Sequence, residues 1–278
     1  MTARFEEGRC AVVTGTGVGI AGIGRAIAYR LAREGVRVLG VVRDDDEITA
    51  ELLSGAGAGP PIEMIAVDLT DDDAPASVLR AIHDVLDGRI DILVNNAGGG
   101  GSAPVHELDL SRWRDMLAIN LDAVFRLTKS VLPLMMSAGY GRIVNISSTK
   151  GLSGHRASSD YAVSKAGLGA LTRSLAADYG AHGITANAVA PGVMVTPQVR
   201  EYLATKPAWF VRESFDIKPV RRDGMVEDIA SAAAFFASDE AGYITAQLLA
   251  VDGGLTRTHY VPDHLVGEAG GSPGLAGR

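Results

Sequence analysis

The stretch of sequence that decides the fold is Cys10-Ala-Val-Val-Thr14-Gly15-Thr-Gly17-Val-Gly19-Ile-Ala-Gly22-Ile-Gly24. It begins with an apolar run that predicts a strand, and it ends where a helix over residues 24–34 is expected. The glycines between them allow a tight turn and let the backbone approach a pyrophosphate at the N-terminus of that helix. The alternative is a flexible surface loop. The position between a first strand and a first helix favours the phosphate-binding interpretation.

Short apolar runs alternate with longer helical patterns along the rest of the chain. Strands are expected over residues 36–42, 62–67, 90–95, 142–146, 185–189 and 247–251. Helices are expected over residues 76–86, 111–137, 161–178 and 227–237. Strands that are apolar on both faces and separated by helices imply a parallel sheet covered on both sides. Right-handed crossovers then predict an α/β, doubly wound Rossmann-type sheet.

No linker divides the chain, so a single domain over residues 1–266 is expected. Residues 196–220 fall outside the alternation of strands and helices, contain three prolines and a tryptophan, and are expected to form a mobile lid over the substrate. Residues 267–278 are rich in glycine and have almost no apolar anchor, so we expect a disordered tail.

Composition excludes several classes of function. The chain has 278 residues, which suits one large α/β domain, and a net charge of -7, so it lacks the basic footprint of a nucleic-acid-binding protein. A single cysteine, Cys10, excludes an internal disulfide. No apolar run approaches the ~18 residues of a membrane span, and the first residues do not form a signal peptide. We therefore expect a cytoplasmic protein without a nucleic-acid, membrane or metal partner.

Tyr161 and Lys165 lie four residues apart in a helix-forming stretch, so their side chains share one helix face. A phenol normally ionises near pH ~10, and an ammonium group one turn away is predicted to lower that pKa. Such a tyrosine could exchange a proton with an alcohol or a ketone near neutral pH. Ser148, which follows an expected strand, could hold the substrate oxygen. The alternative is a partly buried tyrosine beside a solvated lysine.

From about Cys10 to Leu255 the chain resembles the short-chain dehydrogenase/reductase family. The family's glycine loop reads Thr-Gly-x-x-x-Gly-x-Gly, and Thr14-Gly15 and Gly22-Ile23-Gly24 match its two ends. Six residues separate these ends here where the family has three. The longer loop leaves the phosphate contacts open, and Gly17 or Gly19 could share them.

Further short matches follow in the order that the family shows. Asp68-Leu69 ends the third strand, where the family places an Asp near the adenine. Asn95-Asn96-Ala97-Gly98 reproduces the family segment that flanks the cofactor. Pro191-Gly192-Val193, with Thr196, matches the segment that meets the nicotinamide carboxamide, and Val251-Asp252-Gly253-Gly254 matches the C-terminal strand and turn. Each match alone could be structural, but their order and spacing make a chance match negligible.

The resemblance implies roles for four side chains. Tyr161 would be the general acid or base, and Lys165 would lower its pKa and bind the nicotinamide ribose. Ser148, thirteen residues before Tyr161 as is usual in the family, would orient the carbonyl oxygen. Asn120 would hold a proton-relay water, although it could equally satisfy backbone groups within its helix. The residues expected to contact the dinucleotide are Gly15, Gly17, Gly22, Ile23, Gly24, Arg43, Asp68, Leu69, Asn96, Ala97, Gly98, Tyr161, Lys165, Pro191, Gly192, Val193 and Thr196.

The end of the second strand decides which dinucleotide is preferred, because the adenosine ribose lies there. By the resemblance, Val42 occupies the usual Asp place and Arg43 the usual basic place, which favours NADP over NAD. The acidic run Asp44-Asp45-Asp46 opposes a 2′-phosphate. Arg43 could also be an ordinary solvated loop charge.

The leading hypothesis is an NAD(P)-dependent oxidoreductase that interconverts a ketone and a secondary alcohol by hydride transfer. One alternative is an enoyl reductase, but the family's enoyl reductases space their tyrosine and lysine more widely. The other is a non-catalytic dinucleotide-binding sensor, which would not need all four side chains. The substrate pocket is expected beside the loop after Asn95 and residues 152–159, where His155 could touch the substrate. A homo-oligomer, by resemblance a tetramer, is expected because the helices over 111–137 and 161–178 are apolar on more than one face.

Overall fold

The computed structural model describes residues 4–17, 22–44, 60–195, 197–205, 207 and 218–258. Within these ranges seven strands form one parallel sheet in the order β3-β2-β1-β4-β5-β6-β7. The strands are β1 (Cys10–Thr14), β2 (Arg37–Val42), β3 (Glu63–Ala66), β4 (Ile92–Asn95), β5 (Gly141–Ile146), β6 (Ile184–Pro191) and β7 (Leu248–Val251). This order confirms the predicted α/β, doubly wound Rossmann-type sheet.

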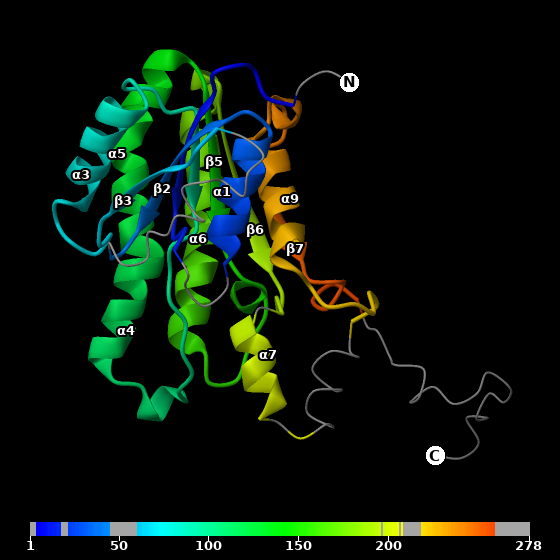
Figure 1. Cartoon of the computed structure of the whole chain (residues 1–278). Helices are drawn as coiled ribbons and strands as arrows, with labels where there is room; N and C mark the ends of the chain where they lie inside the picture. Colours follow the sequence, from blue (N-terminus) through cyan, green and yellow to red (C-terminus); the bar gives the residue numbers. More distant parts are fainter. Residues whose placement is uncertain are drawn as a thin grey trace, which may run out of the picture.

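Helices cover both faces of the sheet (Figure 1). One face packs against α1 (Ile23–Arg33) and α9 (Val226–Ala237), and the other packs against α3 (Ala74–Val85), α5 (Ala123–Ala138) and α6 (Ser159–Tyr179). In β1, Ala11 and Val13 belong to the first core, whereas Cys10 and Val12 belong to the second. Because both faces of the strand are buried, its sequence is a continuous apolar run rather than an alternation.

The helix predicted over residues 111–137 is interrupted in the structure. It consists of α4 (Leu110–Leu117), a π-helical turn η4 (Ala118–Asp122) and α5. Such single π turns inside α-helices often occur at functional sites, and this one contains Asn120. The other predicted strands and helices agree with the structure to within a few residues at their ends.

Shorter elements complete the chain. The 3-10 turns are η3 (Val105–Glu107), η5 (Thr149–Gly151), η6 (Gly180–His182) and η7 (Asp239–Ala241). The predicted lid is described only in part: it contains α7 (Pro197–Ala204) and residues 218–220. The predicted tail over 267–278 lies outside the described residues, and the domain limits stay a prediction. No helix within the described ranges is long and apolar enough to cross a membrane.

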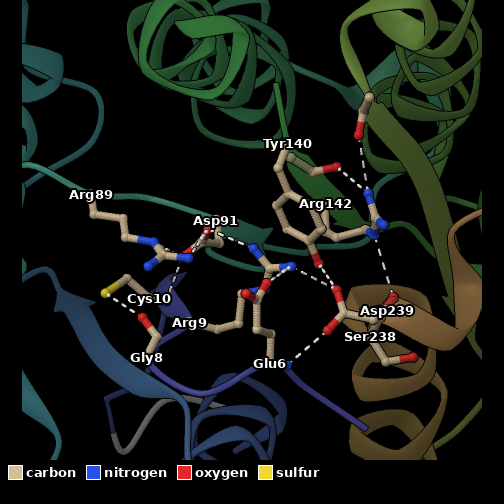
Figure 2. Close-up of polar contacts among 12 residues, drawn as sticks. Glu6, Gly8, Arg9, Cys10, Arg89, Asp91, Tyr140, Arg142, Ser238 and Asp239 are labelled. Carbon is tan, nitrogen blue, oxygen red and sulfur yellow. Dashed lines mark hydrogen bonds and ion pairs between the residues drawn. The ribbon is translucent and has the colours of Figure 1, made fainter. Parts of the chain in front are cut away.

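A cluster of buried ion pairs lies where β1, β4 and β5 begin (Figure 2). Arg9 contacts Asp91 at 3.1 Å and Asp239 at 2.9 Å. Tyr140 donates its hydroxyl hydrogen to Asp239 at 2.7 Å, and the guanidinium groups of Arg9 and Arg142 lie 3.5 and 4.2 Å from the centre of its ring. We call these five residues the amino-edge cluster. It joins the sheet to η7 at the edge opposite to the predicted active site.

Candidate active site

The loops that follow β1 and β4 are bonded to each other at the carboxyl edge of the sheet. The hydroxyl of Thr14 accepts hydrogen bonds from the backbone nitrogens of Asn96 and Ala97, both at 2.9 Å. The side-chain amide of Asn96 donates to the carbonyls of Thr14 and Gly15, both at 3.0 Å. The predicted cofactor residues of these two loops therefore lie together.

The close approach of these loops requires glycine at two positions. Gly15 has a φ of +68°, and a Cβ there would lie 2.8 Å from the Cα of Ala97. A Cβ on Gly24 would collide with the carbonyl oxygen of Gly15. Helix α1 follows Gly22, and among the described residues neither a capping side chain nor an acidic first turn occupies its N-terminus. Backbone N–H groups at such an end attract anions. Gly17 is buried nearby, whereas Gly19 lies outside the described residues.

Strand β5 and helix α6 bring the predicted catalytic side chains together. The ammonium of Lys165 donates to the carbonyl of Ile146 at 2.9 Å and lies 5.7 Å from the centre of the Tyr161 ring. Turn η5 packs against the backbone of α6, since a Cβ on Gly151 would lie 2.8 Å from the backbone nitrogen of Ala166. This packing places Ser148, which precedes η5, beside Tyr161.

The ionisation of this pair differs from the expectation. Burial raises the pKa of Tyr161 above its ordinary value, and a hydrogen bond with the Ser148 hydroxyl opposes that rise. Burial also lowers the pKa of Lys165 to about 8. The prediction that the pKa of Tyr161 lies below its ordinary value is therefore wrong for this structure. Loss of solvation dominates both groups, and the Lys165 ammonium bonds to a backbone carbonyl rather than to the phenol.

Asn120 anchors the glycine-rich loop after β4. It is fully buried, its amide nitrogen donates to the carbonyl of Gly99 at 3.0 Å, and its amide oxygen accepts from the Gly99 nitrogen at 3.2 Å. A Cβ on Gly98 would lie 3.4 Å from the Lys165 ammonium and would collide with the Asn120 oxygen. The loop therefore lies directly beside Tyr161 and Lys165, with the Asn120 side chain fixing it.

The predicted adenosine side lies at the ends of β2 and β3. Arg43 is exposed, and its Nε donates to Asp44 at 2.7 Å. Asp68 accepts from the hydroxyl and the backbone nitrogen of Thr70, and these bonds lower its pKa with a smaller contribution from the positive charge of Arg43. Leu69 is buried beside it. Asp45 and Asp46 lie outside the described residues.

The predicted nicotinamide side lies after β6. Pro191 ends the strand, Gly192 donates to the carbonyl of Val251 at 3.0 Å, and Val193 is exposed. Thr196 lies outside the described residues. A cavity of about 480 Å³ opens beside Val193, between α9 and residues 250–257, but Ser148, Tyr161 and Lys165 do not line it.

Two charged side chains beside the site were not singled out from the sequence. Lys150, two residues after Ser148, donates to the hydroxyl of Ser158 at 3.1 Å. Asp160, next to Tyr161, is completely buried and accepts from Arg112 at 3.2 Å. Both are charged residues next to a motif residue, and that proximity is the signal that could have identified them.

Comparisons with known proteins identify the family of this chain. A family model described as enoyl-(acyl carrier protein) reductase matches residues 18–256. The 3-oxoacyl-[acyl-carrier-protein] reductase FabG of Escherichia coli is 38% identical over 251 residues, which cover 90% of this chain and 98% of that protein. The cis-4-hydroxycyclohexanecarboxylate dehydrogenase of Sinomonas cyclohexanicum is 41% identical over 259 residues, 92% of this chain and 99% of that protein. A solved gluconate 5-dehydrogenase from Burkholderia cenocepacia, in complex with NADP and tartrate, has a TM-score of 0.83 at 31% identity and covers 92% of this chain and 98% of that one.

The doubly wound sheet and these relatives define an NAD(P)-dependent oxidoreductase that acts on CH–OH groups. The chain belongs to the short-chain dehydrogenase/reductase family.

Proposed function

We propose that the protein interconverts a ketone and a secondary alcohol, with Tyr161 as the general acid and base. The observation that carries this proposal is the convergence of the Tyr161 phenol, the Ser148 hydroxyl and the Lys165 ammonium beside an open glycine-rich loop. A Cβ on Gly100 would lie 3.9 Å from the Tyr161 ring, so this loop passes directly beside the ring and its glycines place no side chain there.

A bound nicotinamide would supply or accept the hydride, and the side chains would donate or accept the proton. In the reducing direction the carbonyl oxygen accepts hydrogen bonds from Tyr161 and Ser148, and the Tyr161 proton moves to that oxygen as the carbon receives the hydride. The raised pKa of Tyr161 keeps the phenol protonated and ready to donate. In the oxidising direction the phenolate takes the alcohol proton, and the Lys165 ammonium stabilises that phenolate.

In this proposal Asn120 acts through its backbone carbonyl and not through its side-chain amide. Its amide is occupied by Gly99, so a relay water would be held by the Asn120 backbone carbonyl within the widened π turn. The relay would return a proton to Tyr161 through Lys165.

The dinucleotide would be held along the carboxyl edge. Its pyrophosphate would lie at the uncapped N-terminus of α1, and its nicotinamide ribose against Tyr161 and Lys165. We propose NADP as the preferred form, because Arg43 stands at the end of β2 and solved relatives contain NADP. The remaining proposed contacts are Gly15, Gly17, Gly22, Ile23, Gly24, Asp68, Leu69, Asn96, Ala97, Gly98, Pro191, Gly192, Val193 and Thr196.

The names of the relatives include three chemical classes of substrate. The Escherichia coli relative acts on a 3-oxoacyl thioester, the Sinomonas relative on a hydroxycyclohexanecarboxylate, and the Burkholderia relative on gluconate. All three reactions exchange a ketone for a secondary alcohol. The family model's description supports a second candidate, reduction of an enoyl thioester. The separation of Tyr161 and Lys165 by a single helical turn disfavours that reaction.

A substrate panel followed by nicotinamide absorbance tests these functions. It should contain aliphatic and cyclic ketones, oxo acids, a 3-oxoacyl thioester and a 2-enoyl thioester, each with NADPH and with NADH. We expect turnover of at least one ketone class, no turnover of the enoyl thioester and a preference for NADPH. Turnover of the enoyl thioester alone would establish the second candidate. Cofactor binding without any turnover would indicate a sensor.

We also propose a homo-oligomer formed through α5 and α6. Phe125 on α5 and Val163 on α6 are about half exposed, which leaves apolar surface on both helices after they have covered the sheet. Light scattering at micromolar concentration should return a multiple of the 28.9 kDa monomer mass, by resemblance four times that mass. A monomer mass would refute this proposal.

A further inference from the structure

We infer that Lys150 binds a carboxylate of the substrate, so that the ketone and the alcohol exchanged at Tyr161 are an oxo acid and a hydroxy acid. This inference rests on the proposed function and adds to it the chemical class of the substrate.

The position of Lys150 couples it to the reacting groups. Its backbone nitrogen donates to the Ser148 hydroxyl oxygen at 3.2 Å, and its ammonium lies 5.9 Å from the centre of the Tyr161 ring. The Lys165 ammonium lies at almost the same distance, 5.7 Å, but it is buried and bonded to a strand carbonyl. The Tyr161 ring therefore has two cations beside it, and only Lys150 is partly open to solvent.

The ammonium of Lys150 has N–H donors that no described residue accepts from. It donates to the Ser158 hydroxyl at 3.1 Å and forms no ion pair with any residue in the described part of the chain. An ammonium group carries three donors, so one bond leaves two for other acceptors. The pKa of His155 in the neighbouring loop is lowered mainly by burial. The positive charge of Lys150 makes a second, smaller contribution to that lowering.

Asp160, the acidic residue nearest in sequence to Tyr161, already has hydrogen-bonding partners. Asp160 accepts hydrogen bonds from the Tyr161 backbone nitrogen at 2.8 Å and from Arg112 at 3.2 Å. It is completely buried, so it cannot swing out to pair with Lys150. Among the described residues no carboxylate pairs with Lys150, which leaves its ammonium available to a carboxylate of a ligand. A carbonyl oxygen at Tyr161 and a carboxylate at Lys150 can be joined by a short carbon chain or a ring.

The partner of Lys150 is held in a fixed place. Ser158 is buried and forms a β-bridge with Ala103, and the Ala103 nitrogen donates to the carbonyl of Ala157 at 3.0 Å. Ala157 has a φ of +54°, which costs energy for a residue with a Cβ. Such a backbone conformation persists only where the surrounding contacts hold it in place. Here those contacts fix the position of the Ser158 hydroxyl, which accepts the hydrogen bond from the Lys150 ammonium.

The competing interpretation is structural: Lys150 would only tie η5 to Ser158. Lys150→Gln separates the two roles, because its amide can still donate to Ser158 but carries no charge. Lys150→Arg keeps the charge, and Arg80→Gln removes an exposed cation of α3 as the control.

The experiment compares charged and uncharged ketones of the same shape. Acetoacetate, levulinate and 4-oxocyclohexanecarboxylate are each assayed beside their primary amides with NADPH. For the best oxo acid we expect Lys150→Gln to lower kcat/KM about 10- to 100-fold, the loss of a charge-assisted bond, and to leave the amide within about twofold. Lys150→Arg should keep most of the activity on the acid, and Arg80→Gln should leave kcat/KM for both acid and amide unchanged.

Two results would overturn the inference. One is an equal loss on acid and amide in Lys150→Gln, which indicates a structural tie. The other is a wild-type enzyme that turns over ketones, including a 3-oxoacyl thioester, but prefers none of the acids to its amide. Thermal stabilisation of the NADPH complex by each acid and amide provides a readout without turnover. Stabilisation that depends on Lys150 in the absence of any turnover would reject the proposed function and keep the carboxylate site.

Discussion

The two edges of the sheet bury positive charge in opposite ways. At the amino edge, Arg9 is paired with the carboxylates of Asp91 and Asp239 (Figure 2). At the carboxyl edge, Lys165 is equally buried, yet it contacts a backbone carbonyl and forms no ion pair with a described residue. Burial lowers the pKa of Lys165 to about 8.

The tyrosines of the two edges show the same difference. Burial raises the pKa of Tyr140, and its hydrogen bond to the Asp239 carboxylate raises it further. Burial also raises the pKa of Tyr161, but the neutral hydroxyl of Ser148 works in the opposite direction. The Tyr140 hydroxyl donates its hydrogen to a carboxylate of the protein, whereas the Tyr161 hydroxyl is hydrogen-bonded with the neutral hydroxyl of Ser148. Completed ion pairs stabilise a fold, and incompletely paired buried groups are typical of reactive sites.

Among the variants that compare the two edges, Lys165→Met should have the largest effect on activity. We expect kcat to fall by at least about 100-fold, since the phenolate loses its cation. The free energy of unfolding should be equal to or higher than that of the wild type, because a buried charge without a carboxylate partner is removed. Steady-state kinetics and urea unfolding measure the two quantities. A clear loss of stability would show that Lys165 serves the fold.

Asp91→Asn tests the amino-edge cluster. Asp91 accepts from Arg9, Arg89 and the Cys10 nitrogen, so its loss leaves buried charge unpaired. We expect the free energy of unfolding to fall by about 3–5 kcal/mol while kcat changes little. The matched control is Asp87→Asn, whose exposed pair with Arg37 should contribute less than about 1 kcal/mol. Equal effects of the two variants would contradict the role assigned to this cluster.

Arg43→Ala tests whether the carboxyl edge binds the 2′-phosphate of NADPH through Arg43. Loss of a charge-assisted phosphate contact should weaken NADPH binding by about 1.5–3 kcal/mol and leave NADH binding unchanged. Fluorescence titration of both cofactors measures the difference. If both dissociation constants rise equally, Arg43 does not bind the 2′-phosphate.

The smallest expected effect is a pH dependence. The folded-state pKa of Lys165 is about 8, below its ordinary value of 10.5, so above pH 8 the unfolded chain holds more protons at this residue. Its contribution to stability should therefore increase with pH, by about 1 kcal/mol between pH 8 and 9. Subtracting the unfolding curves of Lys165→Met isolates this contribution. A flat difference would mean that the lysine pKa is not lowered.

The fold was predictable because its signals are local. A glycine-rich loop between a strand and a helix, and apolar runs of strand length between helices, determine a parallel sheet without knowledge of distant contacts. The proximity of Tyr161 and Lys165 followed from one helical turn, whereas the place of Ser148 beside them was implied by the family resemblance.

Other features depend on contacts between residues far apart in sequence. The amino-edge cluster joins Arg9 to Asp91 and Asp239, which no periodic pattern connects. The π turn at Asn120 has no signal in residue type, since its residues also suit an α-helix. The pKa of Tyr161 was misjudged because burial, which a sequence does not show, outweighs the nearby lysine.

A pair of tyrosine variants tests the central claim most directly. Tyr161→Phe should lower kcat by about 10²–10⁴-fold and leave the dissociation constant of NADPH and the free energy of unfolding nearly unchanged, because only the proton donor is lost. Tyr140→Phe should lower stability and leave kcat nearly unchanged. Retention of more than about a hundredth of the wild-type kcat in Tyr161→Phe would contradict its assignment as the proton donor.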